Sequence, residues 1–87
     1  MSVQGFADAP PIVEHITDYD KRHLVTYLRL LDAANEQADW REVVQVIFGL
    51  DAALERERAQ QVHDRHLARA RWMTRSGYRH LLTQATP

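Results

Sequence analysis

The stretch that decides the fold is the basic segment from residue 64 to residue 82, which reads DRHLARARWMTRSGYRHLL. It contains five of the eleven Lys and Arg residues of the chain, one acid and one of the two tryptophans. A helix-stop signal lies inside it at Ser76-Gly77. Placed on a helix at about 100° per residue, residues 59–75 separate into two faces. The face expected to pack in the core consists of Ala59, Val62, His63, His66, Leu67, Ala70 and Met73.

The opposite face of this helix carries most of the candidate functional residues. Trp72 lies there, which is the wrong side for a simple core residue. In one interpretation the segment after Gly77, with Tyr78, Leu81 and Leu82, folds back over the indole. In the other, Trp72 is a partly exposed anchor of an Arg-rich interface, because Trp and Arg dominate the energetics of protein interfaces. The predicted partner-binding residues are Arg65, Arg69, Arg71, Trp72 and Arg75.

The composition indicates one small intracellular domain. With 87 residues, the chain can bury only about 60% of its unfolded surface. It has no cysteine, no apolar run approaching the roughly 20 residues of a membrane span, and no signal-peptide pattern, so we expect a cytoplasmic protein without membrane contact. Residues 1–51 hold four bases and nine acids, and residues 52–87 hold seven bases and three acids. This asymmetry favours a bipolar molecule that meets charged protein surfaces.

Ahead of the basic segment, the chain divides into an arm and a first helix. Residues 1–11 are predicted to be a flexible N-terminal arm, since Gly5 and two prolines break helices. Residues 12–16 could form one helical turn. A long helix then follows from about residue 18 to residue 36, capped by Thr17, Asp18 or Asp20. Its expected core stripe consists of Leu24, Tyr27, Leu28, Leu31 and Ala34.

The next two helices form a helix-turn-helix pattern. Asp39 and Glu42 are spaced as a capping box, and the apolar helix they begin is expected to be the central buried helix, ending at Gly49. Asp51 is the candidate cap of a helix from about residue 52 to residue 75. The predicted fold is therefore all-α, a four- or five-helix bundle with a helix-turn-helix-like core in a single domain, residues 12–83, with a tail at 84–87.

The same pattern predicts no or weak DNA binding. The start of the second helix, which would approach base edges in a DNA-reading domain, carries three acids and two bases between residues 51 and 58. His63 and His66 share a helical face, but no third ligand accompanies them, so no metal is expected. We also expect no enzyme, no catalytic residue, no cofactor and no small-molecule substrate, because no phosphate loop or nucleophile motif is present.

Three groups of residues resemble a known family. They are DWREVV at 39–44, GLD at 49–51, and HLARARWMT at 66–74 followed by GYRHLL at 77–82. They resemble a proteobacterial domain of unknown function found on mobile genetic elements, over roughly residues 18–82. In longer members of that family the domain is part of transcriptional activators and has a helix-turn-helix-like fold.

Stand-alone members of this length include the QseM-type antiactivators of rhizobial integrative and conjugative elements. These bind and silence a quorum-sensing activator of the TraR type and an excision activator of the FseA type. The resemblance implies an inhibitor of transcriptional activator proteins that represses excision and conjugative transfer, and thereby horizontal gene transfer. The alternative is a DNA-binding helix-turn-helix regulator using the same helix.

Overall fold

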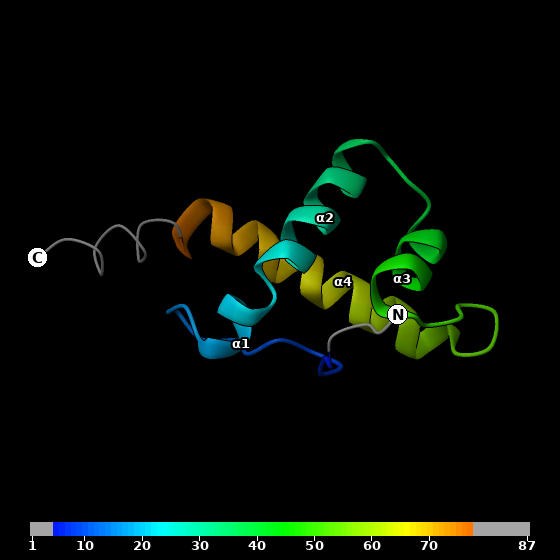
Figure 1. Ribbon diagram of the computed structural model, residues 1–87, viewed down its shortest axis with the longest axis horizontal. Helices are drawn as coiled ribbons and strands as arrows, with labels where there is room; N and C mark the ends of the chain where they lie inside the picture. The colour runs from blue at the N-terminus through cyan, green and yellow to red at the C-terminus, as the bar shows by residue number, and fades with distance from the viewer. Residues whose placement is uncertain (1–4, 78–87) are drawn as a thin grey trace, which may run out of the picture.

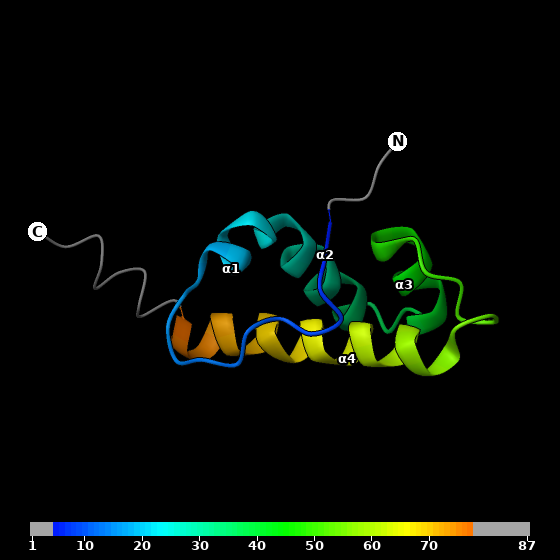
Figure 2. The same ribbon diagram turned by 90° about the horizontal axis from the view of Figure 1, so that it is seen from below.

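The computed structural model describes residues 5–77, which form four α-helices and one π-helix. They are α1 (Asp18–Arg22), α2 (Leu24–Asn35), α3 (Trp40–Phe48), α4 (Arg56–Trp72) and η1 (Met73–Gly77). The described residues contain no strand, so the predicted all-α class is confirmed. Helices α1, α2 and α3 all lie on one side of α4 (Figures 1 and 2). No helix in this part of the chain is long and apolar enough to cross a membrane.

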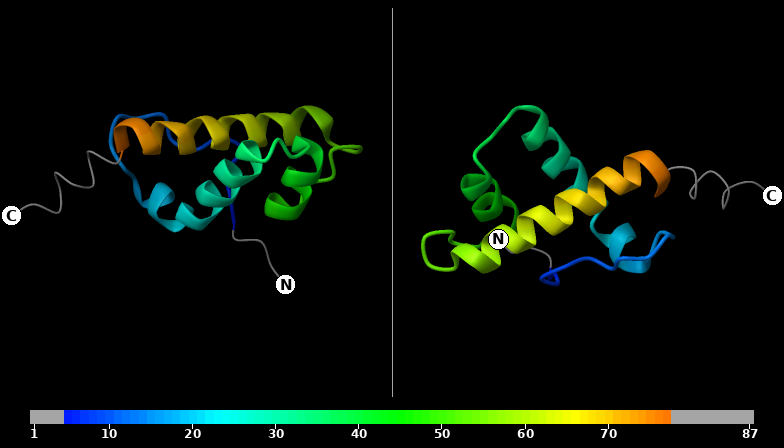
Figure 3. Two further views of the ribbon diagram at one scale, coloured as in Figure 1. Left: turned by 90° about the horizontal axis from the view of Figure 1, so that it is seen from above. Right: turned by 180° about the vertical axis from the view of Figure 1, so that it is seen from behind.

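The core face of α4 was predicted correctly. Ala59, Val62 and Ala70 are completely buried, and Leu67 is 9% exposed. They pack against side chains from α2 and α3 in the larger core cluster, or against the smaller cluster of Ile16, Tyr27 and Met73. Because α2 and α3 both contact α4, this helix is the central one (Figure 3, left).

Helix α3 is therefore not the central buried helix that its apolar composition predicted. Val43, Val44, Ile47 and Phe48 are buried, whereas Val46 is 66% exposed. The predicted termini are correct, since the Asp39 carboxylate accepts from the backbone N–H of Arg41 and Gly49 ends the helix at φ 72°. Within the described residues, Glu42 makes no return hydrogen bond to complete the predicted capping box.

The helix expected from residue 18 to residue 36 is divided at His23, which lies between α1 and α2. The two ring nitrogens of His23 lie 2.8 Å and 2.9 Å from the carbonyl oxygens of Tyr19 and Gly5. These contacts hold the ring against α1 at the point where the helix axis changes. The capping box is at Thr17 and Asp20, at the start of α1. Residues 12–16 contain no helical turn.

The core stripe of α2 is also shifted from the prediction. Tyr27 and Leu30 are 2% and 1% exposed, whereas Leu24 and Leu28 are 40% and 62% exposed. The helix meets α3 and α4 along the line of Tyr27, Leu30 and Leu31, so that Leu24 and Leu28 lie at the edge of the contact. An apolar edge of α2 is thus left open within the described part of the chain.

The turn between α3 and α4 is longer than predicted. Asp51 does not cap α4, because its carboxylate accepts from the backbone N–H of Ala53 and its carbonyl from those of Leu54 and Glu55. These bonds form a turn over residues 52–54, and α4 begins only at Arg56. The helix then runs through Trp72 into η1, which ends at the predicted stop signal.

The N-terminal segment, residues 5–16, packs on the helices, which its composition did not predict. It runs along one edge of α4 (Figure 2). The Phe6 ring meets the Phe48 ring edge to face, with 5.0 Å between centroids, and the backbone N–H of Ala7 donates to the Tyr19 hydroxyl. Pro10 is buried. The described part of the predicted flexible arm therefore covers the helical core.

Candidate protein-binding surface

The side chain of Arg69 is built into the interior of the protein. It is 6% exposed, and it forms a two-bond pair with Asp20, Nε to Oδ1 at 3.0 Å and Nη2 to Oδ2 at 2.7 Å. It also donates from Nη1 to the Val13 carbonyl at 2.6 Å and from Nη2 to the His15 carbonyl at 2.8 Å. The prediction that Arg69 pairs with acidic groups of a partner is therefore wrong, because its donors are engaged inside the chain.

Asp20 is completely buried, and two residues besides Arg69 donate hydrogen bonds to its carboxylate. The Tyr27 hydroxyl donates to Oδ1 at 2.7 Å, and the backbone N–H and hydroxyl of Thr17 donate to Oδ2. Burial by itself would raise the pKa of Asp20, but the hydrogen bonds from Arg69, Thr17 and Tyr27 outweigh it and lower the pKa to about 2. Asp20 is therefore ionised at neutral pH and ties α1 to α4.

Trp72 lies directly beside this buried pair. The Arg69 guanidinium carbon is 4.0 Å from the centre of the Trp72 ring, which is cation–π geometry. The indole is partly buried and packs against the cluster of Ile16, Tyr27, Ala70 and Met73. Trp72 is thus neither a fully covered core residue nor a free anchor. The predicted cover by residues 78–82 lies outside the described residues.

The Trp72 groove is a hollow of about 530 Å³ between α4 and residues 9–14 of the N-terminal segment. Arg65, Ala68, Arg69 and Trp72 line its α4 side. On the opposite side, Ile12 and Val13 are 87% and 39% exposed. The groove therefore combines an aromatic side chain, an apolar rim and a guanidinium, which is the composition of many protein-binding sites.

The remaining predicted residues are exposed arginines. Arg65, Arg71 and Arg75 all face solvent, and none of them forms an ion pair within residues 5–77. The structure brings Arg65 and Trp72 together in the groove, whereas Arg71 and Arg75 do not line it. The view from behind shows the side of α4 that faces away from α2 and α3 (Figure 3, right).

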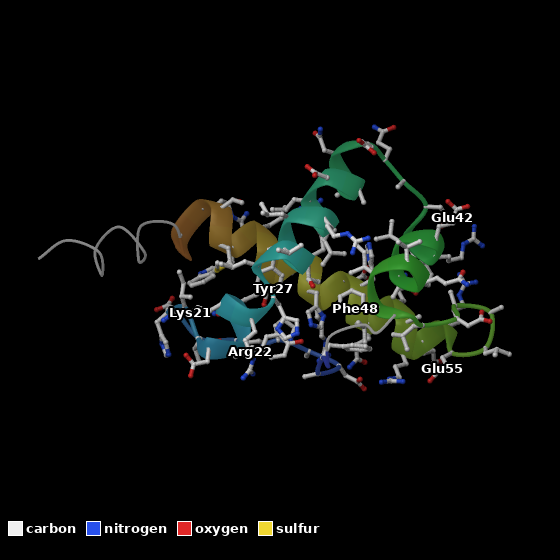
Figure 4. The ribbon with its side chains drawn as sticks, in the orientation of Figure 1. Lys21, Arg22, Tyr27, Glu42, Phe48 and Glu55 are labelled. Carbon is white, nitrogen blue, oxygen red and sulfur yellow. The ribbon has the colours of Figure 1, made fainter. Side chains whose placement is uncertain are left out.

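The other end of α4 has a different charge pattern. Arg58 is paired with Asp8 and with Glu55, at 3.1 Å in both cases, and Glu57 is exposed nearby. Glu42 and Glu55 lie at the α3 end of the molecule, whereas Lys21 and Arg22 belong to α1 (Figure 4).

The two histidines considered as metal ligands have other partners. Nδ1 of His66 donates to the Val62 carbonyl at 2.7 Å, and Nε2 accepts from the Tyr19 hydroxyl at 2.6 Å. Burial lowers the pKa of His66, so the ring is neutral at neutral pH. Nδ1 of His63 lies 2.9 Å from Oδ1 of Asp64, and the His63 ring is tilted against the Trp40 ring.

Sequence reasoning missed the residues that shape this site, namely Asp20 and the apolar pair Ile12 and Val13. Asp20 was considered only as a helix cap, because Arg69 is 49 positions away and local periodicity does not connect them. The paired prolines before Ile12 were interpreted only as helix breakers. They could have indicated a fixed extended segment, since proline restricts both its own φ and the residue before it.

Residues 2–83 match a protein family described as the DNA-binding domain of a type VI secretion system (T6SS) transcription factor, RovC. No curated protein matches the chain. Because the match covers nearly the whole sequence, the chain belongs to this family.

Proposed function

We propose that this member of the RovC DNA-binding-domain family regulates transcription as an antiactivator, by binding an activator protein in the Trp72 groove. One observation carries the proposal: an exposed Arg65, which forms no ion pair within residues 5–77, lies beside a partly buried Trp72 under an apolar rim. Trp and Arg at the centre of a contact supply most of its binding energy, and Arg65 can pair with a carboxylate of the activator.

The charge at the start of α4 supports protein binding over the reading of DNA sequence. In a helix-turn-helix domain these N-terminal residues approach base edges through a field of phosphates. Here Arg58 is neutralised by Asp8 and Glu55, and Glu57 adds a further negative charge. Binding DNA through this end would release few counterions.

In this proposal the protein acts in the cytoplasm by stoichiometric binding, without catalysis or cofactor. Its targets are transcriptional activators of the quorum-sensing and excision types, and the result is repression of excision and conjugative transfer of a mobile element. The family resemblance of residues 66–82 supports this choice of targets.

The second candidate is a DNA-binding transcriptional regulator, which the family match favours. Arg56, Gln60, Arg65 and Arg71 are exposed along α4 and could contact phosphates or base edges. This candidate uses the whole exposed face of α4, whereas the antiactivator uses its C-terminal half.

Two variants of the purified protein distinguish the candidates. Arg65→Glu reverses a charge in the Trp72 groove, and Arg56→Glu is the matched control at the start of α4. Binding is measured by calorimetry with co-expressed quorum-sensing and excision activators of the host, and by mobility shift with host promoter DNA at about 150 mM salt. The antiactivator loses activator binding with Arg65→Glu alone and shows no selective DNA binding. Submicromolar, sequence-selective DNA binding that both variants weaken would establish the second candidate instead.

A further inference from the structure

A second hollow, the α2 groove, shares no lining residue with the Trp72 groove. Its volume is about 360 Å³, and it lies between α2 and the end of α4. It is lined by Leu24, Tyr27, Leu28 and Leu31 of α2 and by Ala70, Met73 and Thr74. The exposed fractions of Leu24 and Leu28, 40% and 62%, are large for leucines that share one hollow. Covering them would remove apolar surface from water, which is favourable.

The described part of the chain ends close to this groove. Met73 and Thr74 line the groove and belong to η1, which ends at Gly77, so the described chain ends three residues after the last residue of the lining. The five residues from Tyr78 to Leu82 can span up to roughly 17 Å when extended. A segment of this length can lie along the groove without any change in the helices.

The sequence that follows Gly77 has the apolar pattern that the groove requires. In the sequence, Tyr78, Leu81 and Leu82 have the spacing i, i+3 and i+4, which is the apolar pattern of one face of an amphipathic helical turn, and Arg79 and His80 are the polar residues between them. Glycine at position 77 permits a change of chain direction, because it readily adopts left-handed backbone conformations. Covalent attachment also gives this segment a far higher effective concentration at the groove than a separate molecule has.

We propose that residues 78–82 of the same chain dock in the α2 groove, with Leu81 and Leu82 against Leu24 and Leu28. This inference does not rest on the proposed function, since the α2 groove shares no lining residue with the Trp72 groove. In this proposal residues 78–82 cover the apolar edge of α2, and the indole of Trp72 is covered only by the N-terminal segment.

Disulfide trapping tests the proposal, because the chain contains no cysteine of its own. The test pair is Leu28→Cys with Leu81→Cys, and a second pair replaces Leu82 in place of Leu81. The matched control is Val25→Cys with Leu81→Cys, since Val25 is 69% exposed on the same helix but does not line the groove. The single variant Leu28→Cys detects contact between two copies of the chain, because one cysteine can form only an intermolecular disulfide. Circular dichroism checks that each reduced variant is folded.

Under mild oxidation, at least one test pair should form an intramolecular disulfide roughly tenfold or more faster than the control pair. Equal rates for test and control pairs would overturn the proposal, because an undocked segment does not distinguish Leu28 from Val25. A covalent dimer formed rapidly by Leu28→Cys alone would also overturn it and would assign the groove to a second copy of the chain.

Discussion

Arg69 and Asp20 form a buried ion pair that joins the end of α4 to α1, with Nη2 of the guanidinium 2.7 Å from Oδ2 of the carboxylate. The same guanidinium lies 4.0 Å from the centre of the Trp72 ring and holds the carbonyls of Val13 and His15. The pair therefore fixes the position of the N-terminal segment and of the indole together. The shape of the groove between them therefore depends on this buried salt bridge.

Removing one charge of this pair should destabilise the fold strongly. Asp20→Asn leaves the buried Arg69 without its counterion, which typically costs about 3–5 kcal/mol of the free energy of unfolding. This is a large share of the total for so small a domain. Urea denaturation measures the change. The matched control is Asp39→Asn, because Asp39 pairs with Arg41 on the surface and Asn caps a helix equally well. Equal losses in the two variants would contradict the structural role assigned to Asp20.

Acid should break the buried ion pair between Arg69 and Asp20 by protonating the carboxylate. The pKa of Asp20 is about 2 in the folded protein and about 3.9 in an unfolded chain. Because the folded pKa is the lower one, the carboxylate contributes stability above pH 4, and this contribution is lost as the pH falls from about 4 to about 2. The whole loss amounts to about 2–3 kcal/mol, and roughly half of it, about 1 kcal/mol, falls between pH 5 and pH 3. Urea denaturation at these two pH values measures that half, which should be missing in Asp20→Asn.

His66 should make the fold sensitive to pH in a different range. Burial lowers the pKa of His66, so below about pH 6.5 the unfolded chain takes up a proton that the folded chain does not. Stability should therefore decrease as the pH falls below 6.5, by at most about 1.4 kcal/mol per pH unit. Thermal melts at pH 7.5 and 5.5 measure this slope. His66→Gln should reduce it, whereas His15→Gln, which changes an exposed side chain, should not. A slope unaltered by His66→Gln would refute the assignment.

Helical periodicity predicted the core of α4 because its buried side chains recur at the helix repeat and alternate with polar ones. It could not place Arg69, which lies at the boundary between the two faces and is drawn inside by a carboxylate 49 residues earlier in the chain. It also misplaced the core stripe of α2, because Leu24, Tyr27, Leu28 and Leu30 are all apolar and only the neighbouring helices determine which side is covered. The packing of the N-terminal segment depends on the backbone carbonyls of Val13 and His15. Every residue has such a carbonyl, so no pattern of side chains indicates it.

Trp72 tests whether the groove binds the activator. Trp72→Ala removes a partly buried ring and its contact with Arg69, so we expect a loss of about 1–3 kcal/mol in the free energy of unfolding, smaller than for a fully buried tryptophan. If Trp72 is the anchor, binding to the activator should weaken by about 2 kcal/mol or more, roughly 30-fold in Kd.

The matched control is Trp40→Ala, since Trp40 is also partly buried but belongs to α3, away from the groove. Calorimetric titration of both folded variants with the activator compares them. Weak binding in Trp72→Ala with near-normal binding in Trp40→Ala supports the groove, because loss of stability alone would affect both. If the affinity for the activator falls equally in the two variants, the binding surface lies outside α4.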